Sequence, residues 1–236
     1  MSAQLRAKAL ERGDRASSMV VYRFCRGFLR LLVNRWVRTR SFNAEVLDLD
    51  GPLILAPIHR SHLDSALVAT CCERRVRALG KESLFTTPGV SYLCAALGAI
   101  PVKRGAADRD ALVAARELLA RGESMIVFPE GGRGTGNKIE ELFDGAAWLS
   151  ARTGAPVVPI GIAGTEEALP VGARFLRRSN VVIVVDEPLA APVDPEGRRV
   201  GRQRIKEFSE EIGQRLQAAQ DEAVAHSQSD GKRSKL

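Results

Sequence analysis

Aromatic residues, histidines and paired cysteines are scarce in this chain of 236 residues. Aromatic side chains account for 5% of the residues, and one of the three histidines, His226, lies in a polar stretch near the C-terminus. Imidazole chemistry, if the protein uses it, therefore falls to His59 or His62. The four cysteines form no Cys-x-x-Cys pair and no small disulfide framework. Their spacing argues against the small secreted class and favours a reducing cytosol.

Sequence signatures of several common protein classes are also missing. No Gly-x-Ser-x-Gly occurs, which argues against an ordinary serine hydrolase. Gly131 and Gly136 have the spacing of a Walker A loop, but Asn137 stands at its lysine position and no Ser or Thr follows Lys138. We therefore do not expect nucleotide hydrolysis. The charged N-terminus lacks the apolar core and cleavage site of a secretory signal.

One long window, Ser83–Val102, carries no charge and so resembles a membrane span. It contains a Thr-Thr-Pro-Gly sequence and a second glycine, Gly98. Its apolar density is too low for a spanning helix. We expect a buried passage of turn, helix and strand instead.

The net charge of +7 is concentrated at one end of the chain. Residues 1–42 hold ten Arg or Lys and two acids, a net +8, whereas the remainder holds 25 basic and 26 acidic residues, a net −1. From Val20 onward the apolar residues occupy one half of a helical wheel, and Arg23, Arg26 and Arg30 cluster opposite. This pattern predicts that residues 1–41 form a basic amphipathic helical arm, with residues 1–16 loosely ordered.

A basic helix with an apolar face is typical of an anchor on a membrane surface that contains anionic lipid. The alternative is that the apolar face packs on the protein's own core and the arginines are solvated. A nucleic-acid partner is not expected, because no basic–aromatic pattern or recognition motif follows.

After the arm, short apolar runs alternate with helical patterns, which predicts an α/β fold in one domain over residues 42–224. We expect a largely parallel central sheet flanked by helices. The expected strands are Glu45–Leu49, Leu53–Ile58, Val76–Leu79, Met125–Phe128, Val157–Ile160 and Val181–Asp186. The expected helices are Leu63–Cys72, Asp108–Arg121, Ile139–Thr153 and one near Arg198–Ala223. The polar tail, residues 225–236, is expected to be disordered.

The stretch around His59 is the main candidate for chemistry. An apolar strand ends at His59, and Asp64 follows five positions later. Ser61 is expected to cap a helix that opens at about His62. A carboxylate bonded to one ring nitrogen fixes the tautomer, so the other nitrogen can accept a proton from a hydroxyl. The alternatives are a purely structural hydrogen bond and a metal site, and a metal is not expected because no fourth ligand is evident.

Three further motifs follow in order. Gly98–Arg104 is a strand-like run that ends in two cations, and Met125–Gly134 runs from a strand into a Pro-Glu-Gly-Gly turn. The glycines of that turn let backbone approach a ligand closely, and Arg133 beyond it can grip phosphate. The Val157–Ile160 run contains Pro159, which alone predicts an edge strand or a bulge.

These four segments, in this order, resemble the blocks of the glycerolipid acyltransferase family, which includes 1-acylglycerol-3-phosphate and glycerol-3-phosphate acyltransferases. His59-x4-Asp64 resembles the first block, Gly98–Arg104 the second, Phe128–Gly131 the third and Val158–Ile160 the fourth. The likeness covers roughly residues 40–190. The chain departs from the family pattern at Ile58, where asparagine is frequent, and at Gly132-Arg133-Gly134, where Thr-Arg-Ser is frequent.

The resemblance implies an O-acyltransferase that needs no cofactor and takes its acyl chain from coenzyme A or acyl carrier protein. His59 would be the general base and Asp64 would orient it. Glu130 and Gly131 would shape the site, Glu130 by holding an arginine or the turn, while Arg60 is expected to point to water. The residues implied to bind the substrate phosphate are Lys81, Arg104 and Arg133.

The expected acceptor is 1-acylglycerol-3-phosphate, with phosphatidate as product and the cytoplasmic face of the membrane as location. The alternatives are glycerol-3-phosphate, another lyso-lipid, or a non-enzymatic module that binds membrane or nucleic acid.

Overall fold

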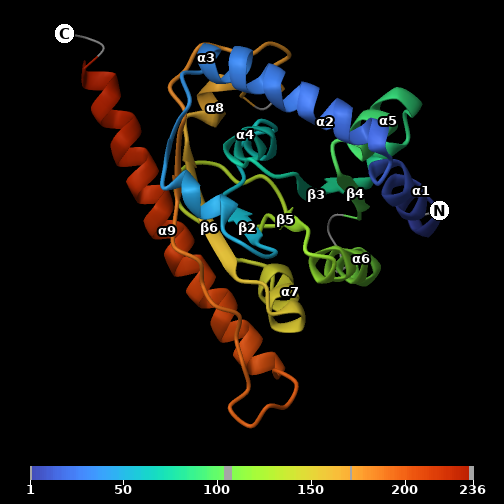
Figure 1. Ribbon diagram of the computed structural model, residues 1–236. Coiled ribbons are helices and arrows are strands. Elements are labelled where there is room, and N and C mark those ends of the chain that lie inside the picture. The colour runs from blue at the N-terminus through green and yellow to red at the C-terminus, as the bar shows by residue number, and fades with distance from the viewer. Residues whose placement is uncertain (1, 104–107, 171, 234–236) are drawn as a thin grey trace.

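The computed structural model describes residues 2–103, 108–170 and 172–233, and it contains a seven-stranded sheet (Figure 1). The strands lie in the order β1-β7-β6-β2-β5-β3-β4. Their bounds are β1 Arg40–Phe42, β2 Ile54–Pro57, β3 Val76–Lys81, β4 Ala99–Val102, β5 Ser124–Ile126, β6 Val157–Ala163 and β7 Val182–Val185. All pairs are parallel except β6–β7. The predicted α/β fold with a largely parallel sheet is confirmed.

Helices cover both faces of the sheet (Figure 1). On one face, α4 (Asp64–Cys71) and the N-terminal arm pack over Leu55, Val158 and Ile160. On the other, α6 (Arg109–Ala120), α7 (Gly145–Thr153) and part of α9 (Arg202–Arg233) pack over Ile54 and Met125. Because successive strand residues point to opposite faces, both sets are buried and the central strands are continuously apolar.

The long helix α9 lies directly against β6 because β6 carries a glycine at the contact. A Cβ placed on Gly161 would stand 2.1 Å from the carbonyl oxygen of Ala219. The Gln220 side chain accepts a hydrogen bond from the Ile162 N–H at 2.8 Å, which fixes the helix along the strand. This close approach explains why a small residue is required at position 161.

Two expected elements are wrong in type or extent. The strand expected over Glu45–Leu49 is a 3-10 helix, η2 (Ala44–Asp48), because Asn43 just before it has a left-handed backbone (φ 55°) that interrupts the extended chain. The helix expected to begin at Ile139 begins at Gly145. Upstream, the Phe143 N–H donates to the Pro129 carbonyl at 2.8 Å, which holds this segment against the 129–134 turn.

Pro159 does not mark an edge strand, since β6 pairs with β2 on one side and β7 on the other. The β6–β7 ladder begins with Ile160–Val185, so the proline stands at its end, where the Pro159 carbonyl still accepts the Asp186 N–H at 3.0 Å and only the reciprocal bond is missing. The tail expected to be disordered from residue 225 continues α9 as far as Arg233. The ring of His226 stacks on Phe42 with centroids 4.1 Å apart, which ties this end of the helix to β1.

The N-terminal arm is helical from Ser2 to Trp36 except at the turn 14–15, including the part expected to be loosely ordered. It consists of α1 (Ser2–Gly13), α2 (Ala16–Phe28), a π-helical turn η1 (Leu29–Val33) and α3 (Asn34–Trp36). The last residues of the predicted arm, from Arg40, belong to β1 and therefore to the sheet.

Two of the three clustered arginines, Arg26 on α2 and Arg30 on η1, bond to the protein, whereas Arg23 is exposed. The Arg30 Nε donates to the Thr70 carbonyl at 2.7 Å, and Arg26 donates to the Cys72 carbonyl at 2.7 Å. These carbonyls belong to the C-terminal end of α4, where unpaired oxygens and the helix dipole attract cations. The apolar residues that this orientation leaves exposed are Val20, Phe24, Phe28 and Leu31, at 69%, 75%, 50% and 68%.

The uncharged window folds as a turn, a helix and a strand, as predicted: η3 (Glu82–Phe85), α5 (Pro88–Ala96) and β4. It is not wholly buried, because Val90, Tyr92 and Leu93 on α5 are exposed. Within the described ranges, no helix combines the length and the apolar content that crossing a membrane requires.

Candidate active site

Four parallel strands bring the sequence motifs to one edge of the sheet. The carboxyl ends of β2, β5, β3 and β4 are neighbours in that order. They deliver His59, Glu130, Lys81 and Lys103 respectively. Ligands of open α/β sheets bind at this kind of edge.

His59 and Asp64 form a buried pair at the end of β2. The Nδ1 of His59 lies 3.0 Å from Oδ2 of Asp64, and the two residues are 5% and 0% exposed. The same carboxylate oxygen accepts the backbone N–H groups of Arg60 and Ser61, each at 2.7 Å. Asp64 therefore holds the turn as well as the imidazole. The helix begins at Asp64, so the expected cap by Ser61 at about His62 is wrong.

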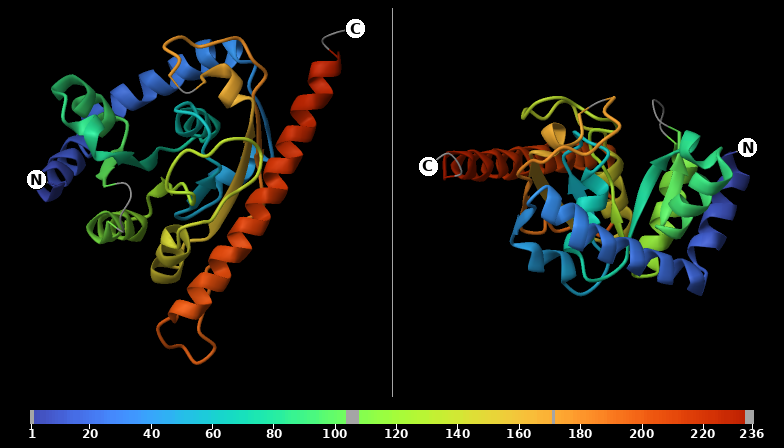
Figure 2. Two further views of the ribbon diagram at one scale, coloured as in Figure 1. Left: turned by 180° about the vertical axis from the view of Figure 1, so that it is seen from behind. Right: turned by 90° about the horizontal axis from the view of Figure 1, so that it is seen from above.

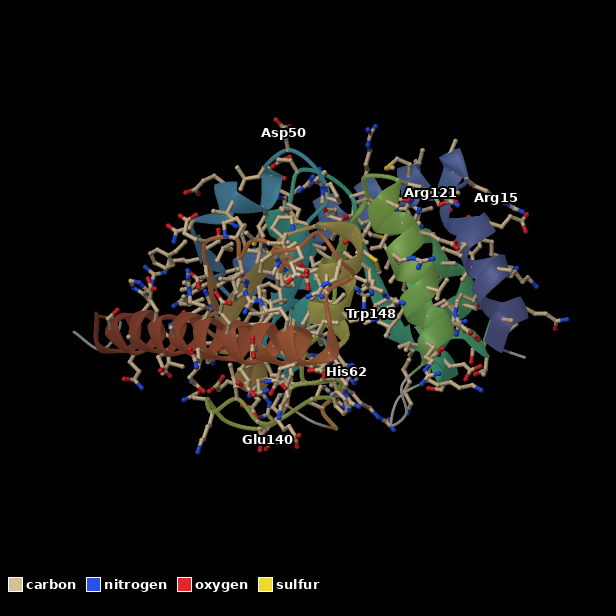
Figure 3. All side chains as sticks on the ribbon, turned by 90° about the horizontal axis from the view of Figure 1, so that it is seen from below. Arg15, Asp50, His62, Arg121, Glu140 and Trp148 are labelled. Carbon is tan, nitrogen blue, oxygen red and sulfur yellow. The ribbon has the colours of Figure 1, made fainter. Side chains whose placement is uncertain are left out.

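The imidazole of His59 is also fixed by an aromatic ring. It stacks on Phe128, with centroids 3.9 Å apart and an interplanar angle of 22°. With Nδ1 facing Asp64, the other ring nitrogen is the one available for chemistry. His62, labelled in Figure 3, is exposed on the surface.

Arg60 does not point to water as expected; it is 3% exposed and bound to Glu130. Its guanidinium lies 2.9 and 2.8 Å from the two Glu130 carboxylate oxygens. The Glu130 Oε1 also accepts the His59 backbone N–H at 3.0 Å. Glu130 thus holds an arginine, as expected, and the backbone that it also holds is that of His59 rather than that of its own turn.

The remaining donors of Arg60 hold the loop that follows the Pro-Glu-Gly-Gly turn. They reach the carbonyls of Gly136 at 2.6 Å and Lys138 at 3.0 Å. The Gly134 N–H returns a hydrogen bond to the His59 carbonyl at 2.9 Å. A Cβ on Gly134 would stand 2.7 Å from the Arg60 guanidinium, so glycine is needed for this contact.

An apolar cavity of about 630 Å³ opens beside His59 between β3, β4, α6 and α7. Its lining is largely carbon, and Trp148, labelled in Figure 3, is its largest side chain. Gly131 lies on its rim with φ +64°, and a Cβ there would stand 2.7 Å from the ring of Phe143. An apolar cavity with one imidazole at its wall can hold a hydrocarbon chain next to a proton acceptor.

The cations predicted to bind phosphate do not gather at the cavity. Lys81 and Arg133 are exposed and do not line the cavity, and Arg104 lies outside the described residues. Two other cations, Lys103 and Arg109, do line it.

Asp108, also on the cavity wall, links this region to the N-terminal arm. Its carboxylate caps α6 by accepting the Ala111 N–H at 3.1 Å, and it pairs with Arg6 of α1 at 3.0 Å. Burial alone would raise the pKa of Asp108, but the N–H donors of Lys103 and Ala111, with the charge of Arg6, lower the pKa below its usual range.

Among the described residues, no group of three or more His, Cys, Asp or Glu side chains is placed to hold a metal ion. Sequence reasoning placed Arg60 in water, noted Lys103 only as one of two cations that end its strand, and missed the stacking of Phe128 and the cavity residue Trp148. The Phe-Pro-Glu-Gly motif did signal Phe128, whereas no spacing rule links position 60 to position 130.

Comparison with known proteins is consistent with this geometry. The model of the family described as Acyltransferase matches residues 38–163, which is more than half of the chain. The chain belongs to this acyltransferase family.

Individual relatives extend the likeness. The chain is 26% identical over 179 residues to a chloroplastic 1-acyl-sn-glycerol-3-phosphate acyltransferase of Brassica napus, covering 71% of this chain and 52% of the relative. It is 32% identical over 145 residues to a Chlamydomonas reinhardtii protein of the same name, covering 59% and 43%. The chain thus spans about half the length of these relatives.

The fold resembles the crystal structure of the 1-acyl-sn-glycerophosphate acyltransferase of Thermotoga maritima. The TM-score is 0.68 at 24% identity, over 86% of this chain and 80% of that one. At this identity the match confirms the fold.

Proposed function

We propose that this protein transfers a fatty acyl chain from a thioester donor to the free hydroxyl of 1-acylglycerol-3-phosphate, forming phosphatidate. The observation that carries the proposal is the buried His59–Asp64 pair, 3.0 Å apart, beside an apolar cavity of about 630 Å³. The relatives named above, which are 1-acylglycerol-3-phosphate acyltransferases, support the choice of acceptor.

In the proposed reaction the acceptor hydroxyl attacks the thioester carbonyl carbon while Nε2 of His59 takes its proton. Asp64 holds the Nδ1–H and stabilises the imidazolium that forms. The carbon–sulfur bond then breaks, and the thiolate leaves with the proton from the imidazolium. No covalent acyl-enzyme and no cofactor is required in this scheme.

The cavity provides room for the donor's acyl chain, and cations near its wall provide for phosphate. Lys103 and Arg109 line the cavity. Lys81 ends β3, the strand next to β4. We infer that these cations, with Arg104 and Arg133, hold the acceptor phosphate and so place the hydroxyl beside His59.

We also propose that the protein binds peripherally to the cytoplasmic face of a membrane. The exposed apolar residues of α2 and those of its neighbour α5 support this proposal. Phe24 and Phe28 lie on a face that no part of the described chain covers, at 75% and 50% exposure. Exposed aromatic and aliphatic side chains on an amphipathic helix are typical of interfacial anchors.

Glycerol-3-phosphate, another lyso-lipid and a non-enzymatic binding role are the competing assignments. They are tested by offering purified protein an acyl thioester with lysophosphatidate and glycerol-3-phosphate in parallel reactions. We expect phosphatidate from lysophosphatidate. Product from glycerol-3-phosphate alone would reassign the acceptor, and no transfer from any thioester by folded protein would contradict the enzymatic assignment.

A further inference from the structure

Five arginines and two aromatic side chains gather where the N-terminal arm meets the sheet. They come from residues 35–38, at the end of α3, and from the loop 172–178, which follows α8 (Thr165–Ala168). All seven are exposed. We call this set the arginine surface, and its members are Arg35, Trp36, Arg38, Arg174, Phe175, Arg177 and Arg178.

The chain just after the loop is hydrogen-bonded to the chain at the end of α3, which brings the two segments together although they are far apart in sequence. The Val181 N–H donates to the Val37 carbonyl at 3.0 Å, and the Arg40 N–H donates to the Val181 carbonyl at 2.9 Å. Figures 1 and 2 show α3 and the loop after α8 at the same end of the molecule. The positive charges of both segments therefore contribute to one local electrostatic potential.

The loop is fixed so that its arginines and its aromatic ring face outward. The Arg177 N–H donates to the Ala168 carbonyl at 2.7 Å, and Leu176 packs against the buried core. Next to this inward residue, Phe175 is 83% exposed, and Trp36 is 52% exposed. Two large aromatic side chains left in water beside arginines mark a contact surface.

None of these five guanidinium groups has a carboxylate within ion-pair distance in the part of the chain that the structure describes. The acids of the preceding helix α8 are Glu166, which accepts the Gly136 N–H at 3.3 Å, and Glu167. The surface thus keeps a strong positive charge that calls for an anionic partner.

We propose that the arginine surface binds the phosphate headgroups of an anionic lipid bilayer, with Phe175 and Trp36 entering the interface. Arginine with exposed aromatic residues suits this boundary, because the cations meet lipid phosphate and the rings occupy the headgroup level. The inference rests on the membrane role proposed for α2, which runs through η1 into α3, and it adds a second contact of different chemistry.

This contact would bring the bilayer next to the catalytic turn. The loop leaves α8 just after Leu169, whose carbonyl accepts a hydrogen bond from the Ser61 hydroxyl at 3.2 Å. Ser61 belongs to the turn that carries His59 and Asp64. An acceptor lipid leaving the bilayer at the arginine surface would therefore start beside the site.

The test is co-sedimentation of the full chain with phosphatidylcholine vesicles, with or without phosphatidylglycerol. The variant is R174E/R177E/R178E. The control is R116E/R198E/R199E, which changes the net charge equally on α6 and on the loop before α9, away from this end of the molecule (Figure 1). Each basic residue near an anionic surface contributes about 1 kcal/mol, so the variant should bind anionic vesicles at least about 100-fold more weakly. The control should lose much less affinity for anionic vesicles.

Equal binding by the variant and the wild type, or an equal loss in the control, would overturn the proposal. The proposal would also be overturned if the triple variant no longer bound purified acyl carrier protein but bound vesicles as the wild type does. That result would assign the surface to a protein partner. An F24S/F28S variant tests the contact of α2 separately. If F24S/F28S loses vesicle binding and R174E/R177E/R178E does not, the proposal for the arginine surface is contradicted while that for α2 stands. Absence of vesicle binding by the wild type would contradict both membrane proposals. Acyl transfer is measured separately on detergent-dispersed substrate, so that the enzymatic assignment is tested independently of membrane binding.

Discussion

Arg60 and Glu130 form an ion pair that is closed to solvent, with 2.8 Å between a guanidinium nitrogen and Oε2 and side-chain exposures of 3% and 5%. The pair joins the end of β2 to the end of β5 and so fixes the backbone on either side of His59. Loss of this ion pair would displace the imidazole, although neither residue is proposed to touch the acyl group. We therefore regard both as positioning residues.

Removing one partner of this pair should be costly, because it leaves the other charge buried. We expect Arg60→Ala to lower the free energy of unfolding by about 3–5 kcal/mol. The double variant Arg60→Ala/Glu130→Gln should lose about 2 kcal/mol less than the sum of the single changes. Urea denaturation of the four proteins measures this coupling.

The matched control is Arg15–Glu11, a pair at the same 2.8 Å distance whose side chains are 56% and 69% exposed. Its coupling should be about 0.3–0.5 kcal/mol, since solvent screens an exposed pair. Equal coupling in the two pairs would show that burial of Arg60 and Glu130 is energetically irrelevant.

Trp148 should limit the length of the acyl chain that the cavity accepts. Trp148→Ala removes the largest side chain of the lining, so the ratio of kcat/KM for a long-chain donor to that for a medium-chain donor should rise about 10-fold or more. Val193→Ala, which truncates an apolar side chain that is 74% exposed, is the control. An unchanged ratio in Trp148→Ala would remove the cavity from the donor site.

Local patterns in the sequence predicted the central sheet and the His59–Asp64 pair. The strands β2, β6 and β7 are short, largely apolar runs, and the pair is separated by only five positions, so both follow from near neighbours. The Arg60–Glu130 pair spans 70 positions and exists only because β2 and β5 are adjacent in the sheet. No local pattern encodes that adjacency.

The orientation of the N-terminal arm was open for a related reason. Its helical wheel separated arginines from apolar residues but did not say which side meets the protein. The carbonyls at the C-terminal end of α4 decide it by accepting hydrogen bonds from Arg26 and Arg30. That acceptor site depends on where α4 ends, which the arm's own sequence does not contain.

Gly161 and Gly27 should respond oppositely to alanine. At position 161 the added Cβ meets the Ala219 carbonyl at 2.1 Å, so α9 must shift and the free energy of unfolding should fall by about 3 kcal/mol or more. At position 27, within α2, no atom lies within 4 Å of the added Cβ. Alanine should therefore raise the free energy of unfolding by about 0.5–1 kcal/mol. Thermal and urea denaturation of both variants test this, and destabilisation by Gly27→Ala would contradict the placement of α2.

Cys71 and Cys72 should resist alkylation in the folded protein. Burial raises the pKa of Cys71 to about 11 and that of Cys72 to about 12. At about pH 8 both thiols are therefore neutral, and the thiolate is the reactive form. Iodoacetamide followed by peptide mass spectrometry should leave this peptide unmodified in native protein and modify it in urea. Equal labelling in both states would show that the end of α4 is open to solvent.

In the proposed reaction His59 acts as the base and Asp64 orients it. The direct test is the rate of thiol release from an acyl thioester, dependent on lysophosphatidate, for wild type, His59→Ala and Asp64→Asn, with folding checked by circular dichroism. General-base catalysis is worth about 10²–10⁴-fold, so His59→Ala should lose about that factor in kcat and Asp64→Asn a comparable one. A folded His59→Ala protein that retains acyl transfer within a few-fold of wild type would contradict the role of His59 as the base.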